Sequence, residues 1–232
     1  MKRALAAALL AVLASGCGPT RQSHESGRAT LWVTRDRGAE VLVAKKVPAG
    51  ITAMDALRRG AKVETRYGGR FVKAINGLEG DVGKRRDWFF FVNGYDGDRS
   101  AADYTLRDGD VEWWDYRSWS KQQRVPIVVG AFPEPFLHGY DGKRRPAVVA
   151  ALNPAGAREI GRRLGARVML ATARLPKNAN ILYLGPPRAR ERFEARLATP
   201  GASAGSPVRM LFIGNWRDLF NGKFRRRYAV QP

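Results

Sequence analysis

The sequence contains one cysteine and two histidines in 232 residues. A single thiol cannot form a disulfide bond within the chain, and a zinc site built from cysteine and histidine ligands is excluded as well. Acidic residues are also few, with 21 against 41 lysines and arginines. The formal net charge of +20 favours an anionic partner such as acidic lipid, a phosphate-bearing polymer or an acidic protein, although a GC-rich genome would also enrich arginine.

A phosphate-binding loop is missing too. Gly185-Pro186-Pro187 lacks the glycine pattern and the lysine of such a loop. The carboxylates of Glu134, Asp141 and Glu159 are isolated in sequence, although a fold can bring such groups together. These absences favour a protein that is not an enzyme, and they leave an enzyme with a site between two domains as an alternative.

The first residues are typical of an export signal. Lys2 and Arg3 precede an apolar stretch at 4–13 that is too short to span a bilayer as a helix, and small residues then lead to Cys17. This pattern resembles the lipobox of bacterial lipoproteins, with Ala14 where leucine is more usual. The resemblance implies that Cys17 carries a diacylglycerol after cleavage, and two acyl chains give stable anchoring. An ordinary secretory signal with a chance cysteine is the alternative.

The composition along the chain predicts the domain organisation. Residues 1–17 form the signal, and the polar residues 18–27 read as a flexible tether. A first domain is expected at 28–120 and a second at 124–232. The expected location is the cell envelope, on the extracytoplasmic face of a bacterial membrane.

The first domain is predicted to be a β-grasp fold of the α+β class. Thr52 is the expected N-cap of one helix, with Asp55 in its first turn. A single helix beside several strands suits one helix on a mixed sheet. The expected strands are 29–35, 40–47, 63–67, 71–75, 88–92 and 111–116.

Four motifs in this region resemble the transcobalamin C-terminal-like family. They are Gly50–Leu57, Ile75-Asn76-Gly77, Trp88–Gly94 and Leu106–Asp110, and the resemblance covers about residues 30–118. It implies a β-grasp fold found in bacterial surface proteins. In vertebrate cobalamin carriers this domain closes over the corrinoid beside a helical barrel that is missing here, so cobalamin enters only as a candidate ligand carried over from the fold.

Aromatic residues of this domain are the predicted ligand contacts. Trp113 and Trp114 are adjacent in a strand, so their side chains point to opposite faces. Outward-facing aromatics could form a platform for a flat ligand or a partner protein. Packing beneath the second domain is the alternative. The candidate residues are Trp88, Phe90, Tyr95, Trp113, Trp114 and Tyr116.

The second domain is predicted to be a small α/β sandwich. Asn153-Pro154 begins a helix that ends at Gly165, and a basic helix is expected from Gly185 to about Leu197. A ferredoxin-like order is the first expectation, and a small doubly wound sheet is the rival. The expected strands are 125–129, 147–152, 167–172, 181–184 and 208–213.

Basic residues and one histidine complete the candidate sites of the second domain. His138 is a metal-ligand candidate, although a lone loop histidine is more often merely polar. A polyanion or membrane surface could contact the basic helix and the basic tail, and a solvated face is the alternative. The proposed contacts are Arg188, Arg192, Arg225, Arg226 and Arg227.

The leading hypothesis is a non-enzymatic, membrane-anchored surface lipoprotein whose β-grasp domain presents a binding surface. A corrinoid is its most specific candidate ligand, and an envelope protein is another partner class. A basic envelope scaffold that binds anionic polymer or lipid is the first alternative, and an envelope enzyme with an interdomain site is the second. Nucleic acid is not favoured as a partner, and no cofactor is assigned.

Overall fold

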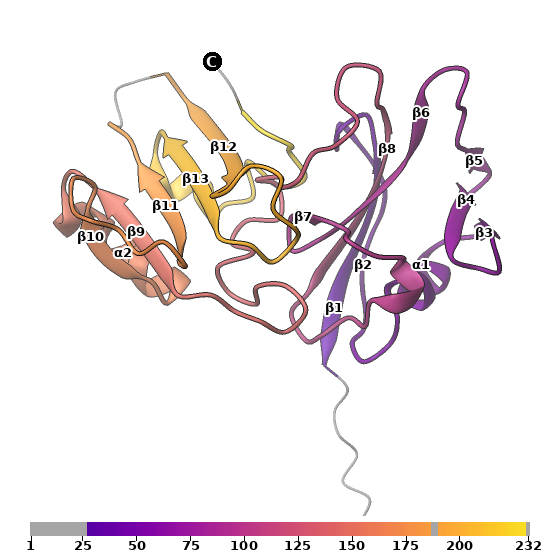
Figure 1. The fold of residues 1–232 in the computed structure, drawn as a ribbon, viewed down its shortest axis with the longest axis horizontal. Coiled ribbons are helices and arrows are strands. Elements are labelled where there is room, and N and C mark those ends of the chain that lie inside the picture. Colours follow the sequence, from indigo (N-terminus) through magenta and orange to yellow (C-terminus); the bar gives the residue numbers. More distant parts are fainter. Residues whose placement is uncertain (1–26, 187–189, 231–232) are drawn as a thin grey trace, which may run out of the picture.

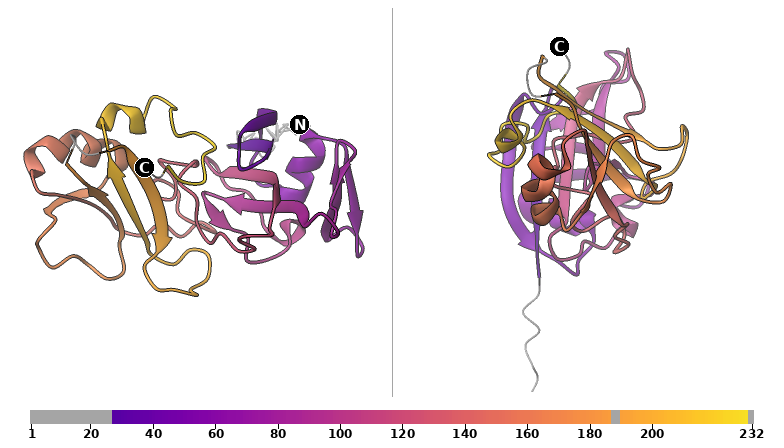
Figure 2. Two further views of the ribbon diagram at one scale, coloured as in Figure 1. Left: turned by 90° about the horizontal axis from the view of Figure 1, so that it is seen from above. Right: turned by 90° about the vertical axis from the view of Figure 1, so that its left-hand side faces the viewer.

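The computed structural model describes residues 27–186 and 190–230. Two sheets lie along the long axis of the molecule, and a small third sheet lies beyond helix α1 at one end (Figures 1 and 2). The predicted signal, Cys17, nearly all of the tether and Arg188 lie outside the described residues. Within the described part, no helix is long and apolar enough to cross a membrane.

The first half contains one α-helix and most of the strands. Its elements are β1 (Arg28–Arg35), β2 (Glu40–Pro48), α1 (Ala53–Gly60), β3 (Val63–Arg66), β4 (Phe71–Ile75), β5 (Leu78–Glu79), β6 (Arg86–Val92), β7 (Tyr95–Asp96), the 3-10 helix η1 (Ala101–Asp103) and β8 (Val111–Ser118). The second half contains β9 (Ala147–Ala151), α2 (Pro154–Leu164), β10 (Arg167–Leu170), β11 (Asn180–Leu184), β12 (Arg192–Leu197), β13 (Val208–Ile213) and the 3-10 helix η2 (Trp216–Leu219).

The first sheet is mixed and has the order β2-β1-β8-β6-β7. Strand β1 pairs antiparallel with β2 and parallel with β8, while β6 pairs antiparallel with β8. Helix α1 buries Met54 and Leu57 against this sheet, and Thr52 caps it by accepting a hydrogen bond from the Asp55 amide at 3.1 Å. The expected helix on a mixed sheet is therefore present, within a mixed α+β structure.

The second sheet has the order β10-β9-β11-β13-β12. Strands β10, β9, β11 and β13 are parallel, and only β12 at the edge runs antiparallel to its neighbour. The predicted ferredoxin-like order is therefore wrong, because that fold has an antiparallel sheet. Helix α2 connects β9 to the parallel strand β10, which is the crossover expected of the rival parallel arrangement.

Residues 192–197 of the predicted basic helix form a strand instead. In β12, Phe193 and Leu197 are buried while Arg196 is exposed, so burial alternates with the period of two that strands impose. The basic residues therefore lie along one face of a strand and do not surround a helix.

The predicted strand at 125–129 does not form as an element. Ile127 makes only an isolated bridge to Tyr95, and Pro126 has no N–H to donate to a ladder. Val128 donates its amide to the Gly94 carbonyl at 2.9 Å, and Val129 donates to that of Tyr228 at 3.2 Å. The segment is apolar because it covers the first sheet.

The hydrophobic core runs through both halves. One cluster includes Leu31 and Leu57 of the first half together with Leu182 and Phe212 of the second. A separate cluster lies on the other face of the first sheet, where Val125, Val128 and Tyr228 cover three aromatic side chains: Trp32, Phe91 and Trp113. The C-terminal segment thus packs onto the first half.

Candidate anion-binding groove and other sites

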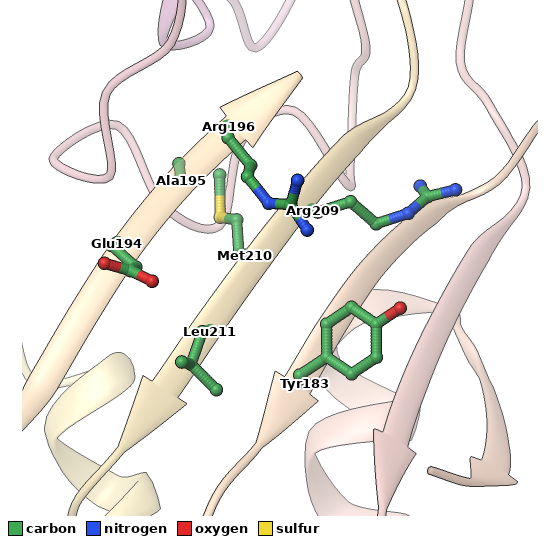
Figure 3. A pocket seen from close by; sticks show the side chains of 7 residues that line it. All are labelled: Tyr183, Glu194, Ala195, Arg196, Arg209, Met210 and Leu211. Carbon is green, nitrogen blue, oxygen red and sulfur yellow. The ribbon is translucent and has the colours of Figure 1, made fainter. Parts of the chain in front are cut away.

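One face of the second sheet is covered by the main core, and the other is covered over β9 and β11 by the β10–β11 connection but open beside β12 and β13. Leu182, Met210 and Phe212 point into the core that includes helix α2. Their neighbours along β11, β12 and β13 point the other way, as the pleat of a strand requires. There Tyr183, Glu194, Arg196, Arg209 and Leu211 line an open groove of about 330 Å³ (Figure 3), and the core-facing residues Ala195 and Met210 also border it.

Arg209 is held in this groove by backbone carbonyls. One terminal nitrogen donates to the carbonyls of Ala179 at 2.7 Å and Val208 at 3.0 Å, and the other donates to that of Lys177 at 3.1 Å. Burial lowers the pKa of the Arg209 guanidinium, and the nearby charge of Arg196 lowers this pKa further. The two positive groups therefore influence each other across the groove.

The one carboxylate that lines the groove in the described structure, Glu194, does not pair with Arg196 or Arg209. Glu194 pairs with Arg192 at 2.8 Å. Among residues 27–186 and 190–230, neither Arg196 nor Arg209 forms an ion pair within 4.0 Å. Guanidinium groups bind phosphate and carboxylate through paired N–H donors, and the Tyr183 hydroxyl lies beside them (Figure 3). This arrangement can bind an anionic group.

The predicted polyanion contacts are dispersed in the structure. Arg192 is occupied by Glu194, and the tail residues Arg225, Arg226 and Arg227 do not line the groove. Arg226 instead lies over the Trp32 ring at 5.4 Å from its centroid. Sequence reasoning did not single out Arg209, although the alternation of the strand 208–213 places it opposite the buried Val208 and Met210.

The predicted aromatic contacts are mostly buried. Trp113 is 0% exposed, and its indole N–H donates to the Thr34 hydroxyl at 2.8 Å. Trp114 stacks on the half-buried Phe90, with ring centroids 5.0 Å apart. Trp88, Tyr95 and Tyr116 are buried as well. The structure brings these side chains together as packing partners, and their role in ligand binding stays a prediction.

His138 has a carboxylate partner that sequence reasoning missed. Its Nδ1 lies 2.5 Å from Oε1 of the buried Glu134, and its backbone N–H donates to Oε2 at 2.9 Å. The hydrogen bond to the Glu134 carboxylate raises the pKa of the His138 imidazole. The separation of four residues was the available signal. No group of three or more metal-ligating side chains occurs in the described part of the chain.

A further pocket, of about 460 Å³, lies where the two halves meet. Its lining residues include Arg37 of the first half and Gln122 of the segment that follows β8. Glu194 and Tyr228 of the second half also line it. This is the position expected for an interdomain site. An enzymatic role for it stays a prediction.

Comparison with known proteins finds a matching family for part of the first half. Residues 50–118 match the family described as a domain of unknown function, DUF4430. Haptocorrin, solved in complex with Cbi, is similar at 17% identity and a TM-score of 0.34, over 40% of this chain and 26% of haptocorrin. A suspected metal-binding protein from Ruminococcus gnavus is similar at 16% identity and a TM-score of 0.33, over 40% of this chain and 97% of that protein. No curated protein matched the chain.

Proposed function

We propose that this chain is a binding protein whose second sheet recognises an anionic group of its ligand. The observation that carries the proposal is the Arg196 and Arg209 pair, which shares one groove without a carboxylate partner in the described structure. Like charges held together repel each other, and an anion between them removes that repulsion. Tyr183 adds a hydroxyl donor, and Leu211 adds an apolar surface for the rest of the ligand.

Titration with inorganic pyrophosphate tests this function. Isothermal titration calorimetry at 50 and 200 mM salt should show saturable binding that weakens as salt rises, because salt screens exposed charges. Glucose, which carries no charge, serves as the control and should give no signal. Absence of pyrophosphate binding at 50 mM salt would contradict the proposal.

A larger anionic polymer or an acidic lipid surface is a second form of the same function. The net charge of +20 and the exposed Arg225 and Arg227 support it, because each basic residue near an anionic leaflet contributes about 1 kcal/mol. Sedimentation with vesicles of phosphatidylglycerol, against vesicles of phosphatidylcholine, tests it. Equal sedimentation with both would exclude the lipid surface.

Corrinoid binding is a separate candidate and involves the first half. Its support is the family match at residues 50–118 and the sequence resemblance to the cobalamin carriers. The aromatic side chains proposed as contacts are buried, so a corrinoid would need a different surface or a local opening. Titration with cobalamin and cobinamide, followed by absorbance, tests the idea. No binding at 100-fold excess over protein would exclude it.

We also propose that the protein is anchored to a bacterial membrane through Cys17. The support is the sequence alone, with a short apolar stretch followed by the single cysteine. Intact mass spectrometry of the native protein should show a diacylglycerol on the N-terminal cysteine. The Cys17→Ser variant should lose this mass and leave the membrane fraction. An unmodified native Cys17 would contradict the anchor.

A further inference from the structure

A third pocket, of about 450 Å³, lies at the carboxyl ends of the parallel strands β9, β11 and β13. It shares no lining residue with the groove of Arg196 and Arg209. The residues after these strands form its rim, and the first turns of α2 form one wall. This volume lies within the range of roughly 300–1,000 Å³ that small-molecule sites occupy.

The chain connections make this end of the sheet a crevice. From β9 the chain crosses through α2 to β10 on one side, and β11 lies on the other side of β9. Helix α2 covers one face, while Ala171, Leu175 and Ala179 of the β10–β11 connection pack on the opposite face. The connection after β9 thus runs to β10 on one side of β9, and the connection after β10 runs back to β11 on the other side of β9. In open parallel sheets, ligands bind outside the carboxyl ends of the strands at such a switch point.

The lining of this pocket is apolar. Its floor is formed by Ala157, Ile160 and Phe212, which are at most 2% exposed. Trp216 lies at the side of the pocket, and the guanidinium carbons of Arg163 and Arg217 lie 5.7 and 5.1 Å from the centroid of its indole ring. The indole gives the pocket an aromatic surface for a ligand ring.

A glycine in the first turn of α2 supplies a separate observation. Gly156 lines the pocket, and a Cβ atom at this position would meet no atom within 4 Å. Its φ is not in the left-handed region. Neither packing nor backbone conformation therefore requires glycine here, although glycine within a helix costs about 0.5–1 kcal/mol relative to alanine. The space above Gly156 is available to a ligand.

We infer that this pocket is a binding site for a small, mainly apolar ring compound, which lies against Trp216 and over Gly156. The site goes beyond the proposed anion-binding function and does not depend on it. Asn153 at the rim uses its side-chain oxygen to cap the helix at Ala155, and among residues 27–186 and 190–230 its NH₂ group has no hydrogen-bond acceptor, so it can donate to a polar substituent. Because the ligand lies over Gly156, a side chain introduced at this position should compete with it for the same space.

Fluorescence titration of the full chain with N-phenyl-1-naphthylamine, a neutral diaryl probe, tests the site. The fluorescence of the probe should increase in a saturable way when it is titrated against the wild type. The Gly156→Leu variant should bind at least 10-fold more weakly, and Gly156→Ala should raise the melting temperature while weakening binding. The matched control is Ala155→Leu, an exposed neighbour on α2 that does not line the pocket. It should bind as the wild type does.

The outcomes separate this site from the anion-binding groove. Loss of probe binding in Gly156→Leu, with retained binding in a variant that lacks both Arg196 and Arg209, supports the inference whether or not pyrophosphate binds. No saturable binding by the wild type would overturn it. Equal affinities of Gly156→Leu, Gly156→Ala and Ala155→Leu would overturn it as well, and thermal melts show that the compared variants are folded.

Discussion

Glu112 is a fully buried carboxyl group in the first sheet. It lies on β8 between Leu31 of β1 and Val92 of β6. Its Oε1 accepts a hydrogen bond from the Trp114 indole at 2.6 Å, and its Oε2 has no partner in the structure. Burial raises the pKa of this carboxyl well above its usual value, so the folded protein holds a proton that the unfolded chain releases.

The pH dependence of stability should report this proton. Because the folded pKa of Glu112 is raised, its contribution is fully present below the unfolded pKa of about 4.3 and is lost as pH rises toward the folded pKa. Glu112→Gln should therefore gain free energy of unfolding relative to the wild type between pH 5 and pH 8, measured by urea denaturation. The exposed Glu40→Gln should not. A constant difference across this range would contradict a protonated Glu112.

His138 gives a second test with the same direction of pH dependence, although here the protonated form that the fold favours is the charged one. Glu134 raises the pKa of the imidazole, so the stabilisation is complete below about 6.5 and is lost as pH rises through the folded pKa. His138→Gln should lower the melting temperature more at pH 5.5 than at pH 9. Equal losses at the two pH values would show that the pair stabilises only as a neutral hydrogen bond.

At the scale of elements, the cap of α1 is a local feature with a measurable contribution. Thr52 accepts a hydrogen bond from the Asp55 amide, which would otherwise be an unpaired donor in the first turn. Thr52→Ala should lower the free energy of unfolding by about 0.5–2 kcal/mol, and Thr52→Ser should retain most of it. Chemical denaturation measures both. Similar losses in the two variants would assign the effect to the methyl group.

Elements with strong local signals were predictable from the sequence. The cap at Thr52 and the end of α2 at Gly165, where φ is 55°, follow from residue chemistry that acts over a few positions. The segment at 192–197 was predicted wrongly because its arginines were read as a helix surface. Its apolar residues instead alternate. Strand direction in the second sheet depends on contacts between distant residues, so composition could not decide it.

The candidate groove was only partly predictable. Alternation in 192–197 and 208–213 places Arg196 and Arg209 on outward faces. Their meeting requires β12 and β13 to pair with Arg196 opposite Arg209, and this register is set by the whole sheet. The burial of the aromatic residues around Trp113 depends on Tyr228, which is more than a hundred residues away in sequence. No local pattern contains that information.

At the scale of the whole molecule, Asp115 joins strand β1 and the turn after it to the C-terminal segment around Tyr228. Its carboxylate accepts hydrogen bonds from the Thr34 hydroxyl at 2.5 Å and from the Tyr228 hydroxyl at 2.8 Å. The Arg37 and Gly38 amides each donate at 3.1 Å. The Tyr228 ring also packs against Phe91 and Trp113. The C-terminal segment is thereby part of the first half's core.

Removing one hydroxyl should weaken this connection. Tyr228→Phe keeps the ring contacts and removes one donor to a buried carboxylate, so we expect a loss of about 1–3 kcal/mol in the free energy of unfolding. The exposed Tyr67→Phe should change stability by less than about 0.5 kcal/mol.

Because one hydrophobic cluster spans both halves, calorimetry of the wild type should show a single transition. Two separate transitions would show that the halves fold independently.

The chain carries a net charge of +20, and in one groove Arg196 and Arg209 lack a carboxylate partner in the described structure. The most direct test is the dissociation constant of inorganic pyrophosphate for the Arg196→Gln/Arg209→Gln double variant. The control is Arg158→Gln, an exposed arginine on α2. Loss of charge-assisted hydrogen bonds of about 1.5–3 kcal/mol each predicts binding at least 10-fold weaker in the double variant and unchanged in the control. Equal affinity in the two variants would contradict anion binding in this groove.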